Sequence, residues 1–179
     1  MRRKVYQTWR RVKLENRTSK YWIKKLNLLA HPEGGWFKEV YRSKETVQKN
    51  ALPDRFTGNR SISTAIYYLL EKGDFSAFHR IKSDEIWHFY DGEPLEIIEI
   101  NPDGNLIKHC LGLNPDNNCF PQIVIPAQSW FAARPAGTFT LVGCTVSPGF
   151  DFEDFEMGEK KKLSALFPEH KRIVEELCR

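Results

Sequence analysis

The chain has 179 residues, 41% of them hydrophobic and 28% charged, which is the composition of an ordinary soluble globular protein. This length favours one domain with a full hydrophobic core over two domains. No apolar run approaches the roughly 20 residues of a membrane-spanning helix, and the N-terminus lacks the apolar segment of a secretory signal, so the sequence predicts neither.

The net charge of +4 is carried by the N-terminal end of the chain. Residues 1–17 contain seven Lys or Arg and one Glu, so they contribute +6 and the remaining residues sum to −2. We therefore divide the chain into a basic N-terminal arm over 1–17 and a single domain over 18–179. The domain lacks the excess of basic residues that is typical of nucleic-acid-binding domains. Nucleic-acid binding by the arm is an alternative to a solvated extension, and it predicts a steep salt dependence.

Short strands dominate the domain. A helix is expected after the arm, with Thr18 or Ser19 as its N-cap, and it ends at the turn HPEGGWF. A helix over 166–178, with Pro168 in its first turn, closes the chain. This order predicts an all-β sandwich or barrel with helices only at its ends. The strands are expected at 36–43, 63–70, 75–81, 85–92, 94–100, 105–113, 120–126, 129–133 and 138–146.

The four cysteines, at positions 110, 119, 144 and 178, form no CxxC pair and no spacing typical of a zinc site. The sequence therefore predicts four structural thiols in a reducing compartment, and so a cytoplasmic protein. In this interpretation none of the four is disulfide-bonded.

The segment GDFSAFHRIKSDEIWHFYDGEPL (73–95) holds two of the five histidines, with a carboxylate between them. The turn at 82–84 allows the two strands that flank it to pair. Because side chains alternate along a strand, His79 and Glu85 are then expected to face the same interior. By the same alternation, His88 points the other way.

The spacing of Gly73, His79, Glu85 and Gly92 resembles the first motif of the cupin superfamily. The resemblance covers about residues 26–157. It implies a double-stranded β-helix (an RmlC-like jelly-roll barrel) that holds one small ligand in an apolar interior. It also implies a homodimer, which the exposed edge strands of a short jelly roll make physically reasonable. Four segments resemble its Cupin_5 group (domain of unknown function 985): HPEGGWFKEVYRS, STAIYYLL, HRIKSDEIWHF and LVGCTVSPGFDFEDFE.

Metal-binding members of this superfamily use two histidines and a glutamate from the first motif and a histidine from the second. Here His79 and Glu85 match two of those positions, whereas Ile81 and Phe131 stand at the other two. A metal ion with two protein ligands would lose most of its coordination energy, so we expect no metal and no other cofactor. His88 would complete a His–Glu–His set only if its strand were bulged.

A buried Glu85 without a metal needs a partner, and His79 is the obvious one, each group shifting the pKa of the other toward neutrality. The resemblance to metal-free sugar epimerases implies an isomerase or epimerase that acts on a sugar or a similar carbonyl compound. His79 would be its base, Glu85 the orienting partner, and Tyr67 or Tyr68 the acid, of which we carry Tyr68 forward. The alternatives are a non-catalytic small-molecule binder and a structural His–Glu pair that fixes two strands in register.

The remaining candidates are ligand-contacting residues of the barrel. Arg42 can hold a carboxylate or phosphate at the barrel mouth, or make a surface salt bridge. The aromatic pair Trp130–Phe131 lines the cavity or packs in the core. The segment GFDFEDFE (149–156) is either a lid over the barrel mouth or an edge that seals the sheet. We expect His31 to belong to a turn and not to contact a ligand. Six residues are predicted to contact a ligand: Tyr41, Arg42, Trp87, His88, Trp130 and Phe131.

Overall fold

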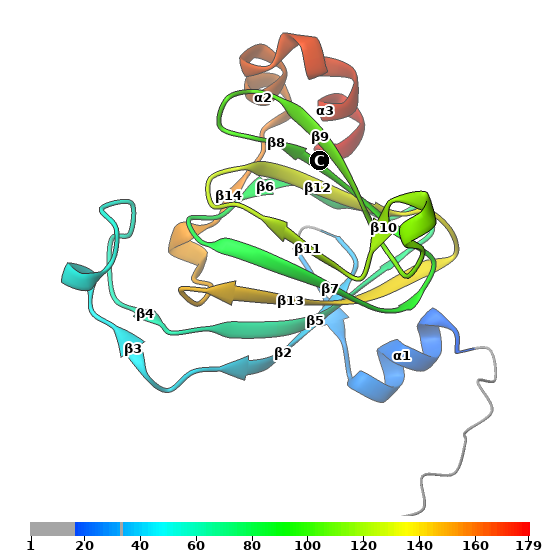
Figure 1. Cartoon of the computed structure of the whole chain (residues 1–179), viewed down its shortest axis with the longest axis horizontal. Helices are drawn as coiled ribbons and strands as arrows, with labels where there is room; N and C mark the ends of the chain where they lie inside the picture. The colour runs from blue at the N-terminus through cyan, green and yellow to red at the C-terminus, as the bar shows by residue number, and fades with distance from the viewer. Residues whose placement is uncertain (1–16, 33) are drawn as a thin grey trace, which may run out of the picture.

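Two six-stranded β-sheets face each other and enclose the hydrophobic core (Figure 1). The computed structural model describes residues 17–32 and 34–179. The strands of the first sheet lie in the order β1 (Leu29–Ala30), β2 (Trp36–Arg42), β5 (Thr64–Glu71), β13 (Phe139–Ser147), β7 (Asp84–Gly92) and β11 (Gln122–Ile125). The strands of the second sheet lie in the order β10 (Cys119–Phe120), β9 (Leu106–Leu111), β8 (Leu95–Ile100), β12 (Trp130–Pro135), β6 (Ser76–Arg80) and β14 (Glu156–Met157).

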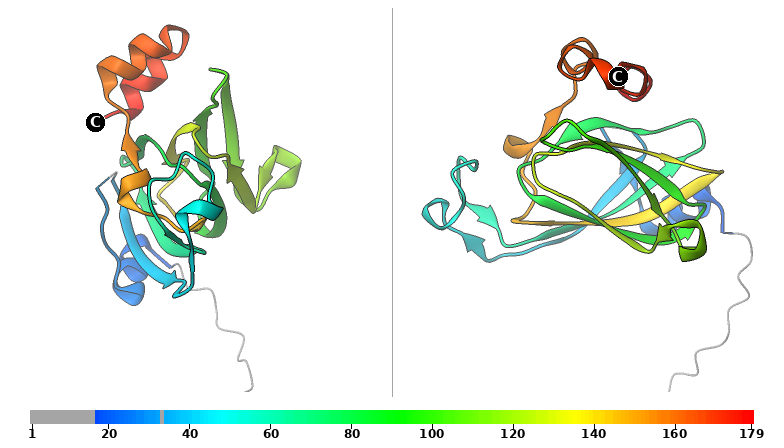
Figure 2. Two further views of the ribbon diagram at one scale, coloured as in Figure 1. Left: turned by 90° about the vertical axis from the view of Figure 1, so that its left-hand side faces the viewer. Right: turned by 45° about the horizontal axis from the view of Figure 1, so that its top comes forward.

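Consecutive strands alternate between the two sheets from β5 to β8 and again from β11 to β14. This alternation is the winding of a double-stranded β-helix, so the predicted all-β jelly-roll fold is confirmed. Neighbouring strands pair antiparallel except β9 and β10, which are parallel. A short arm made of β3 (Thr46–Val47), the 3-10 turn η1 (Lys49–Ala51) and β4 (Arg60–Ser61) projects from one end of the barrel (Figures 1 and 2).

The predicted first helix is confirmed as α1 (Ser19–Leu26). Thr18 is its N-cap, because the Thr18 side chain accepts a hydrogen bond of 3.3 Å from the backbone N–H of Tyr21. The helix ends at Asn27, whose φ of 54° is the left-handed conformation common after a helix. Its apolar side chains pack on the outer face of the first sheet, around Leu69. Except for Arg17, the predicted basic arm lies outside the described residues.

The C-terminal end forms two short helices, α2 (Lys160–Leu166) and α3 (Lys171–Leu177), joined by the 3-10 turn η4 (Pro168–His170). The prediction of one helix over 166–178 is therefore wrong in its first part. Pro168 opens the turn between the helices, because proline has no backbone N–H to continue a helix. Both helices cover the outer face of the second sheet (Figure 2), and Leu163, Val174 and Leu177 are buried there.

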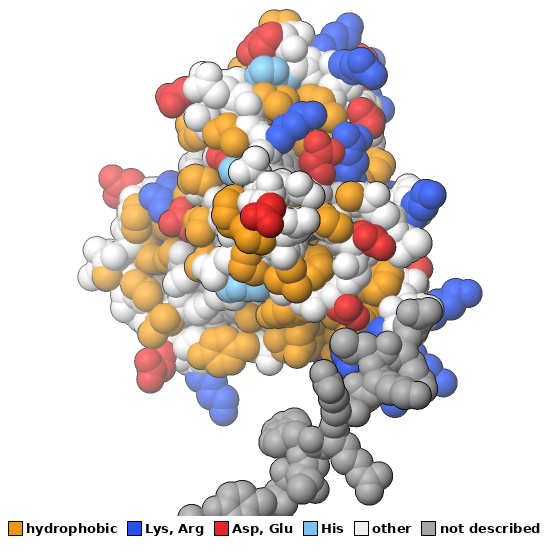
Figure 3. All heavy atoms as spheres, turned by 45° about the vertical axis from the view of Figure 1, so that its right-hand side comes forward, with side chains coloured by type: hydrophobic (Ala, Val, Ile, Leu, Met, Phe, Trp, Pro, Cys, Tyr) orange, Lys and Arg blue, Asp and Glu red, His pale blue; other side chains and the backbone are white. Residues whose placement is uncertain are grey.

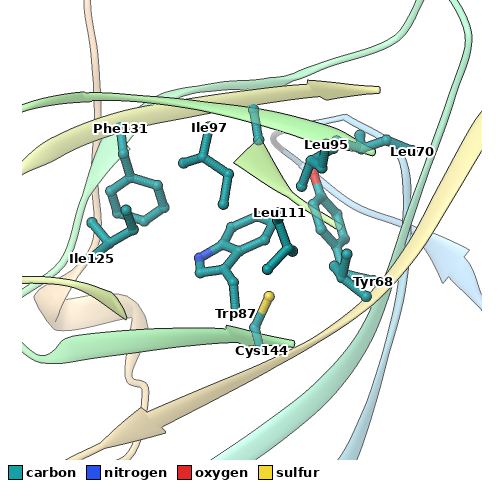
Figure 4. Close-up of a cluster of buried hydrophobic side chains, with 11 residues drawn as sticks. Tyr68, Leu70, Trp87, Leu95, Ile97, Leu111, Ile125, Phe131 and Cys144 are labelled. Atoms are coloured by element: carbon teal, nitrogen blue, oxygen red, sulfur yellow. The ribbon is translucent and has the colours of Figure 1, made fainter. Parts of the chain in front are cut away.

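The space between the sheets is filled by inward side chains of both (Figure 4). Trp87 lies at the centre of this cluster and is 2% exposed. Two further 3-10 turns, η2 (Pro115–Asn117) and η3 (Phe152–Asp154), lie in loops. None of the helices in the described part of the chain has the length and apolar character to cross a membrane. The hydrophobic cluster between the two sheets consists of Tyr68, Leu70, Trp87, Leu95, Ile97, Leu111, Ile125, Phe131, Ala133, Val142 and Cys144.

The expectation that the strands around residues 82–84 pair with each other is wrong. Strand β6 pairs with β12 and β14 in the second sheet, whereas β7 pairs with β13 and β11 in the first. The short connection therefore carries the chain from one sheet to the other, as the jelly-roll winding requires. As a result, His79 and Glu85 face the interior from opposite sheets.

The prediction of four thiols is wrong for two cysteines, because Cys110 and Cys119 form a disulfide. The parallel pairing of β9 with β10 sets Cys119 directly beside Cys110, with 4.4 Å between their Cα atoms. A separation of nine residues is no recognised motif, so only the strand register reveals this pair. Cys144 and Cys178 are buried thiols. The argument from four thiols to a reducing cytoplasm therefore fails, and the cytoplasmic location stays a prediction.

Candidate functional site

A cavity of about 110 Å³ opens inside the barrel, at the end from which the β3–β4 arm projects. It is smaller than the roughly 300 to 1,000 Å³ of pockets for drug-sized ligands, so it suits a molecule with few heavy atoms. Most of its wall is apolar, with a few polar side chains among them. The lining residues are His31, Phe37, Glu39, Arg42, Thr64, Ile66, Tyr68, His79, Ile81, Glu85, Trp87, Cys144, Val146, Phe150 and Phe152.

His79 enters this cavity from β6 and is 3% exposed. Its Nδ1 lies 2.8 Å from the carbonyl oxygen of Ala77. A carbonyl can only accept, so Nδ1 carries the proton of the neutral ring and Nε2 carries the lone pair. The ring packs against the rings of Phe131 and Phe155, at centroid distances of 4.1 and 5.4 Å.

Burial lowers the pKa of His79 to about 4, against the smaller raising effect of its hydrogen bond to Ala77. The imidazole is therefore uncharged at neutral pH, because its apolar surroundings disfavour the imidazolium form. This corrects the expectation that a carboxylate partner moves the titration of His79 toward neutrality. Glu85 does line the same cavity, from β7 in the opposite sheet, and is 8% exposed.

Trp87 lies two residues beyond Glu85 on the same face of β7 and lines the cavity. Among the described residues, no group accepts a hydrogen bond from its buried indole Nε1–H. In Figure 4 the indole nitrogen is directed toward Ile125 and Phe131, away from Tyr68. The ring itself is held by edge-to-face contacts with Tyr68 and Phe131, at 5.9 and 6.3 Å between centroids.

Of the two candidate tyrosines, Tyr68 lines the cavity. Its hydroxyl donates a hydrogen bond of 2.7 Å to the carbonyl oxygen of Gly34, in the turn that follows His31. Tyr67 lies on the other side of β5, where its ring contacts Tyr90 at 6.0 Å. The hydroxyl of Tyr68 thus anchors a loop of the cavity wall.

Arg42 stands at the mouth of the cavity, with 41% of its side chain exposed. Its guanidinium donates to both carboxylate oxygens of Glu39, at 3.1 and 2.7 Å, and to the carbonyl oxygen of Phe150 at 3.0 Å. The hydrogen bond to Glu39 raises the pKa of Arg42 above its ordinary value. Arg42 is therefore charge-paired within the chain, and it ties the mouth to the segment that carries Phe150.

That segment, residues 148–157, is called the strap below. Phe150 and Phe152 of the strap line the cavity mouth, and Glu156–Met157 pairs with the edge of β6. The two interpretations of the acidic and aromatic alternation therefore both hold, because one part covers the mouth and the other seals the sheet. Asp154 anchors the strap through Arg60, at 2.6 and 2.7 Å, and through Lys82 at 3.2 Å.

Residues 20–158 match the Cupin_5 family model, which is described as Cupin superfamily (DUF985). The chain belongs to the Cupin_5 family. Uncharacterized protein YML079W of Saccharomyces cerevisiae is 32% identical over 155 residues, which are 79% of this chain and 77% of the yeast protein. Protein SO0799 from Shewanella oneidensis is 37% identical with a TM-score of 0.82, and a hypothetical protein from Leishmania major is 30% identical with a TM-score of 0.81. Each of these two structures is similar over 90% of this chain and 98% of its own.

The donor set of this cupin does not fit a metal ion. Ile81 lines the cavity at one of the positions where metal-binding cupins have a histidine, and Phe131 is buried beside His79 at another. Within the part of the chain that the structure describes, no three His, Cys, Asp or Glu side chains are grouped to hold a metal. An aliphatic and an aromatic side chain supply no ligand atoms, so we route no chemistry through a metal.

Four predicted ligand-contacting residues lie outside the cavity lining of this Cupin_5 protein, and one of them, Phe131, is packed in the core between the sheets. Tyr41 is 54% exposed. His88 lies on the outer face of the first sheet, with its Nε2 3.2 Å from the hydroxyl of Thr145. Trp130 packs beneath the C-terminal helices, with the guanidinium of Arg80 4.6 Å from its ring centroid.

Strand alternation could have found two lining residues that sequence reasoning missed. Cys144 and Val146 alternate with outward residues along β13, and both line the cavity. His31 also lines it, and its ring contacts Phe37 and Tyr68 at 4.5 and 5.4 Å. No periodic pattern marks His31, because it lies in a turn.

Proposed function

We propose that the cavity binds a small polar molecule. The observation that supports this most is that His79 and Glu85, from opposite sheets, both line an apolar cavity that opens at Arg42. Titratable side chains that line an apolar cavity are concentrated at binding and catalytic sites. Arg42 and the strap mark the entrance.

The second candidate is a metal-independent isomerase or epimerase. It is favoured by the tautomer of His79, whose Nε2 lone pair could remove a proton beside a carbonyl group and leave an enolate. An epimerase returns a proton to the same carbon, whereas an isomerase returns it to the former carbonyl carbon while the hydroxyl proton moves to the other oxygen. Glu85 would orient the substrate and Tyr68 would be the acid. Two observations weigh against it: a pKa of about 4 makes His79 a weak base, and the Tyr68 hydroxyl donates to Gly34. Binding is therefore the first candidate.

The two buried thiols give a matched test of binding. Cys144 lines the cavity, whereas Cys178 is buried beneath the C-terminal helices. We expect at least one compound from a panel of glycerol, dihydroxyacetone, glycolamide and lactate to slow the reaction of Cys144 with methyl methanethiosulfonate, which forms a methyl disulfide and releases methanesulfinate. At ten times its Kd the slowing should be about tenfold, with Cys178 unchanged. Peptide mass spectrometry reads both sites; equal effects on both thiols, or none at Cys144 with any compound, would contradict the proposal.

Proton transfer is tested separately with dihydroxyacetone in D2O. An isomerase is expected to exchange its C–H protons for deuterium, and His79→Asn is expected to abolish that exchange. Binding without exchange, measured by proton NMR, would leave the non-catalytic function standing alone.

We also propose that the chain forms a homodimer through the outer face of the first sheet. Hydrophobic side chains gather in the lower half of the face drawn in Figure 3, whereas Lys and Arg lie mainly at its edges. Tyr90 and Val124, on the neighbouring strands β7 and β11, are 50% and 49% exposed. Large exposed apolar side chains on one face are typical of subunit interfaces.

Sedimentation velocity tests the homodimer. Val124→Glu is expected to convert a dimer into a monomer, because it places a charge in the apolar face. Leu166→Glu is the matched control, since Leu166 is 62% exposed at the end of α2 and should leave the dimer intact. A wild-type chain that is monomeric at high micromolar concentration would refute the proposal.

A further inference from the structure

A disulfide lies at one edge of the second sheet, and neither of its cysteines lines the cavity. It joins Cys110 of β9 to Cys119 of β10, nine residues further along the chain. Strand β10 has two residues and lies at the end of its sheet, where β9 is its neighbour. Two backbone hydrogen bonds also hold this edge, from the N–H of Gly112 to the carbonyl oxygen of Phe120 at 2.8 Å and from the N–H of Cys119 to that of Asn114 at 3.0 Å. The disulfide therefore fastens a short edge strand to the barrel.

The hydrophobic core does not depend on this bond. The cluster between the two sheets takes its side chains from β5, β7, β8, β9, β11, β12 and β13, and none from β10. The bond also closes a short loop, and in the chain-entropy account a short loop constrains the unfolded chain less than a long one. We therefore expect the barrel to stay folded when the bond is opened.

A thiol can approach the disulfide from the side of its loop. Residues 113–118, between the two cysteines, are all exposed. Cys110 is half-buried, whereas Cys119 is 7% exposed. The two thiols, Cys144 and Cys178, are buried at 3% and 4% exposure. Because accessible disulfides exchange with thiols more readily than enclosed ones, they are the bonds that serve as labile or regulatory sites.

We propose that the Cys110–Cys119 disulfide is a reversible redox site, which a dithiol reduces while the barrel stays folded. One thiolate of the dithiol attacks Sγ of Cys110, the more exposed cysteine, and the sulfur of Cys119 leaves as a thiolate. The second thiolate of the dithiol then attacks its own partner sulfur in the mixed disulfide and releases Cys110. Two electrons pass to the cysteines, which take up the two protons that the dithiol loses, and the dithiol ends as a disulfide. This site is independent of the proposed binding function.

Opening the bond changes the surroundings of one strand of the first sheet. Pro121 directly follows β10, and its carbonyl oxygen accepts a hydrogen bond of 2.9 Å from the backbone N–H of Phe89 in β7. The chain then enters β11, which pairs with β7 and places Ile125 beside Glu85. Release of Cys119 therefore loosens the chain from 112 to 121 and disturbs its contact with Phe89.

Thiol labelling of the wild-type chain without denaturant tests the proposal. Dithiothreitol is the dithiol probe, and iodoacetamide then labels free thiols for peptide mass spectrometry. We expect labels on Cys110 and Cys119 and none on Cys178, which stays buried beneath the C-terminal helices for as long as the chain is folded. Replacing dithiothreitol with oxidised glutathione should restore the bond. A disulfide that persists in excess dithiothreitol, or labelling of Cys178 at the same rate as Cys110, would overturn the proposal.

Nitrogen-15 correlation spectra give the second measurement, because they show where the chain changes. Reduction is expected to shift the amide signals between 112 and 120 and that of Phe89. The signals of β5 should stay fixed, since β13 separates that strand from β7. The double variant Cys110→Ser, Cys119→Ser should give its Phe89 signal near the reduced position, and dithiothreitol should not move it. A Phe89 signal at the oxidised position in this variant, or loss of the folded spectrum when the wild-type chain is reduced, would contradict the inference.

Discussion

Replacing Asp154 with asparagine is expected to lower the free energy of unfolding by about 3–5 kcal/mol, because it leaves a buried guanidinium without its counter-charge. Arg60 and Asp154 are 4% and 6% exposed and share two hydrogen bonds. Lys82 adds a third contact to the same carboxylate. Without the Asp154 carboxylate, the buried guanidinium of Arg60 loses the charge that offsets the cost of removing it from water. Urea denaturation followed by tryptophan fluorescence measures the change.

The matched control is Glu153→Gln, one residue away. Glu153 also contacts Arg60, at 3.3 Å, but 66% of its side chain is exposed, so its removal should change stability by less than about 1 kcal/mol. Equal effects of the two substitutions would show that the buried pair contributes no more than a surface contact. A second consequence concerns the strap: with Asp154 replaced, the cavity mouth should open and Cys144 should react faster with methyl methanethiosulfonate.

The same pair contributes a pH dependence at the acid end. Although burial raises it, the hydrogen bonds from Arg60 and Lys82 lower the pKa of Asp154 below its ordinary value of 3.8. The unfolded chain therefore binds this proton more readily than the folded chain does. The stability from Asp154 is present above pH 3.8 and is lost as the pH falls through its lowered pKa.

The fold could be predicted because it depends on local signals repeated along the chain. Short apolar runs between turns rich in Gly, Pro and Asn predicted the strands, and the cap at Thr18 predicted α1. Which strands pair is a different matter, because register is set by the whole barrel and not by the turn between two strands. The turn at 82–84 therefore gave a wrong prediction of which strands pair, and the sequence did not predict the Cys110–Cys119 disulfide.

Part of the site followed from the same alternation. Counting along the strands placed His79 and Glu85 in one interior and His88 outside it, whichever strands they paired with. Counting cannot tell which inward residues border a void and which fill the core. Trp87 illustrates this, because it belongs to the packed cluster and also lines the cavity. Only the three-dimensional packing separates these two roles.

Acidification from pH 6.5 to pH 4 is expected to lower the free energy of unfolding of the wild-type chain by about 3 kcal/mol through His79 alone. Burial lowers the pKa of His79 from 6.5 to about 4. Between pH 6.5 and 4 the imidazole is therefore protonated in the unfolded chain and mostly neutral in the folded chain. The contribution of His79 is fully present above pH 6.5. An ion pair between His79 and Glu85 would raise the pKa instead and produce a slope of the opposite sign.

The variant His79→Asn isolates this effect, because the asparagine amide can still donate to the carbonyl oxygen of Ala77 but cannot titrate. Denaturation curves at several pH values should show that this variant, although less stable at pH 7, loses the slope between pH 6.5 and 4. His88→Asn, on the outer face of the first sheet, should retain the slope of the wild type. A wild-type chain that grows more stable on acidification would mean that His79 is charged in the folded state. The cavity would then favour an anion over a neutral compound.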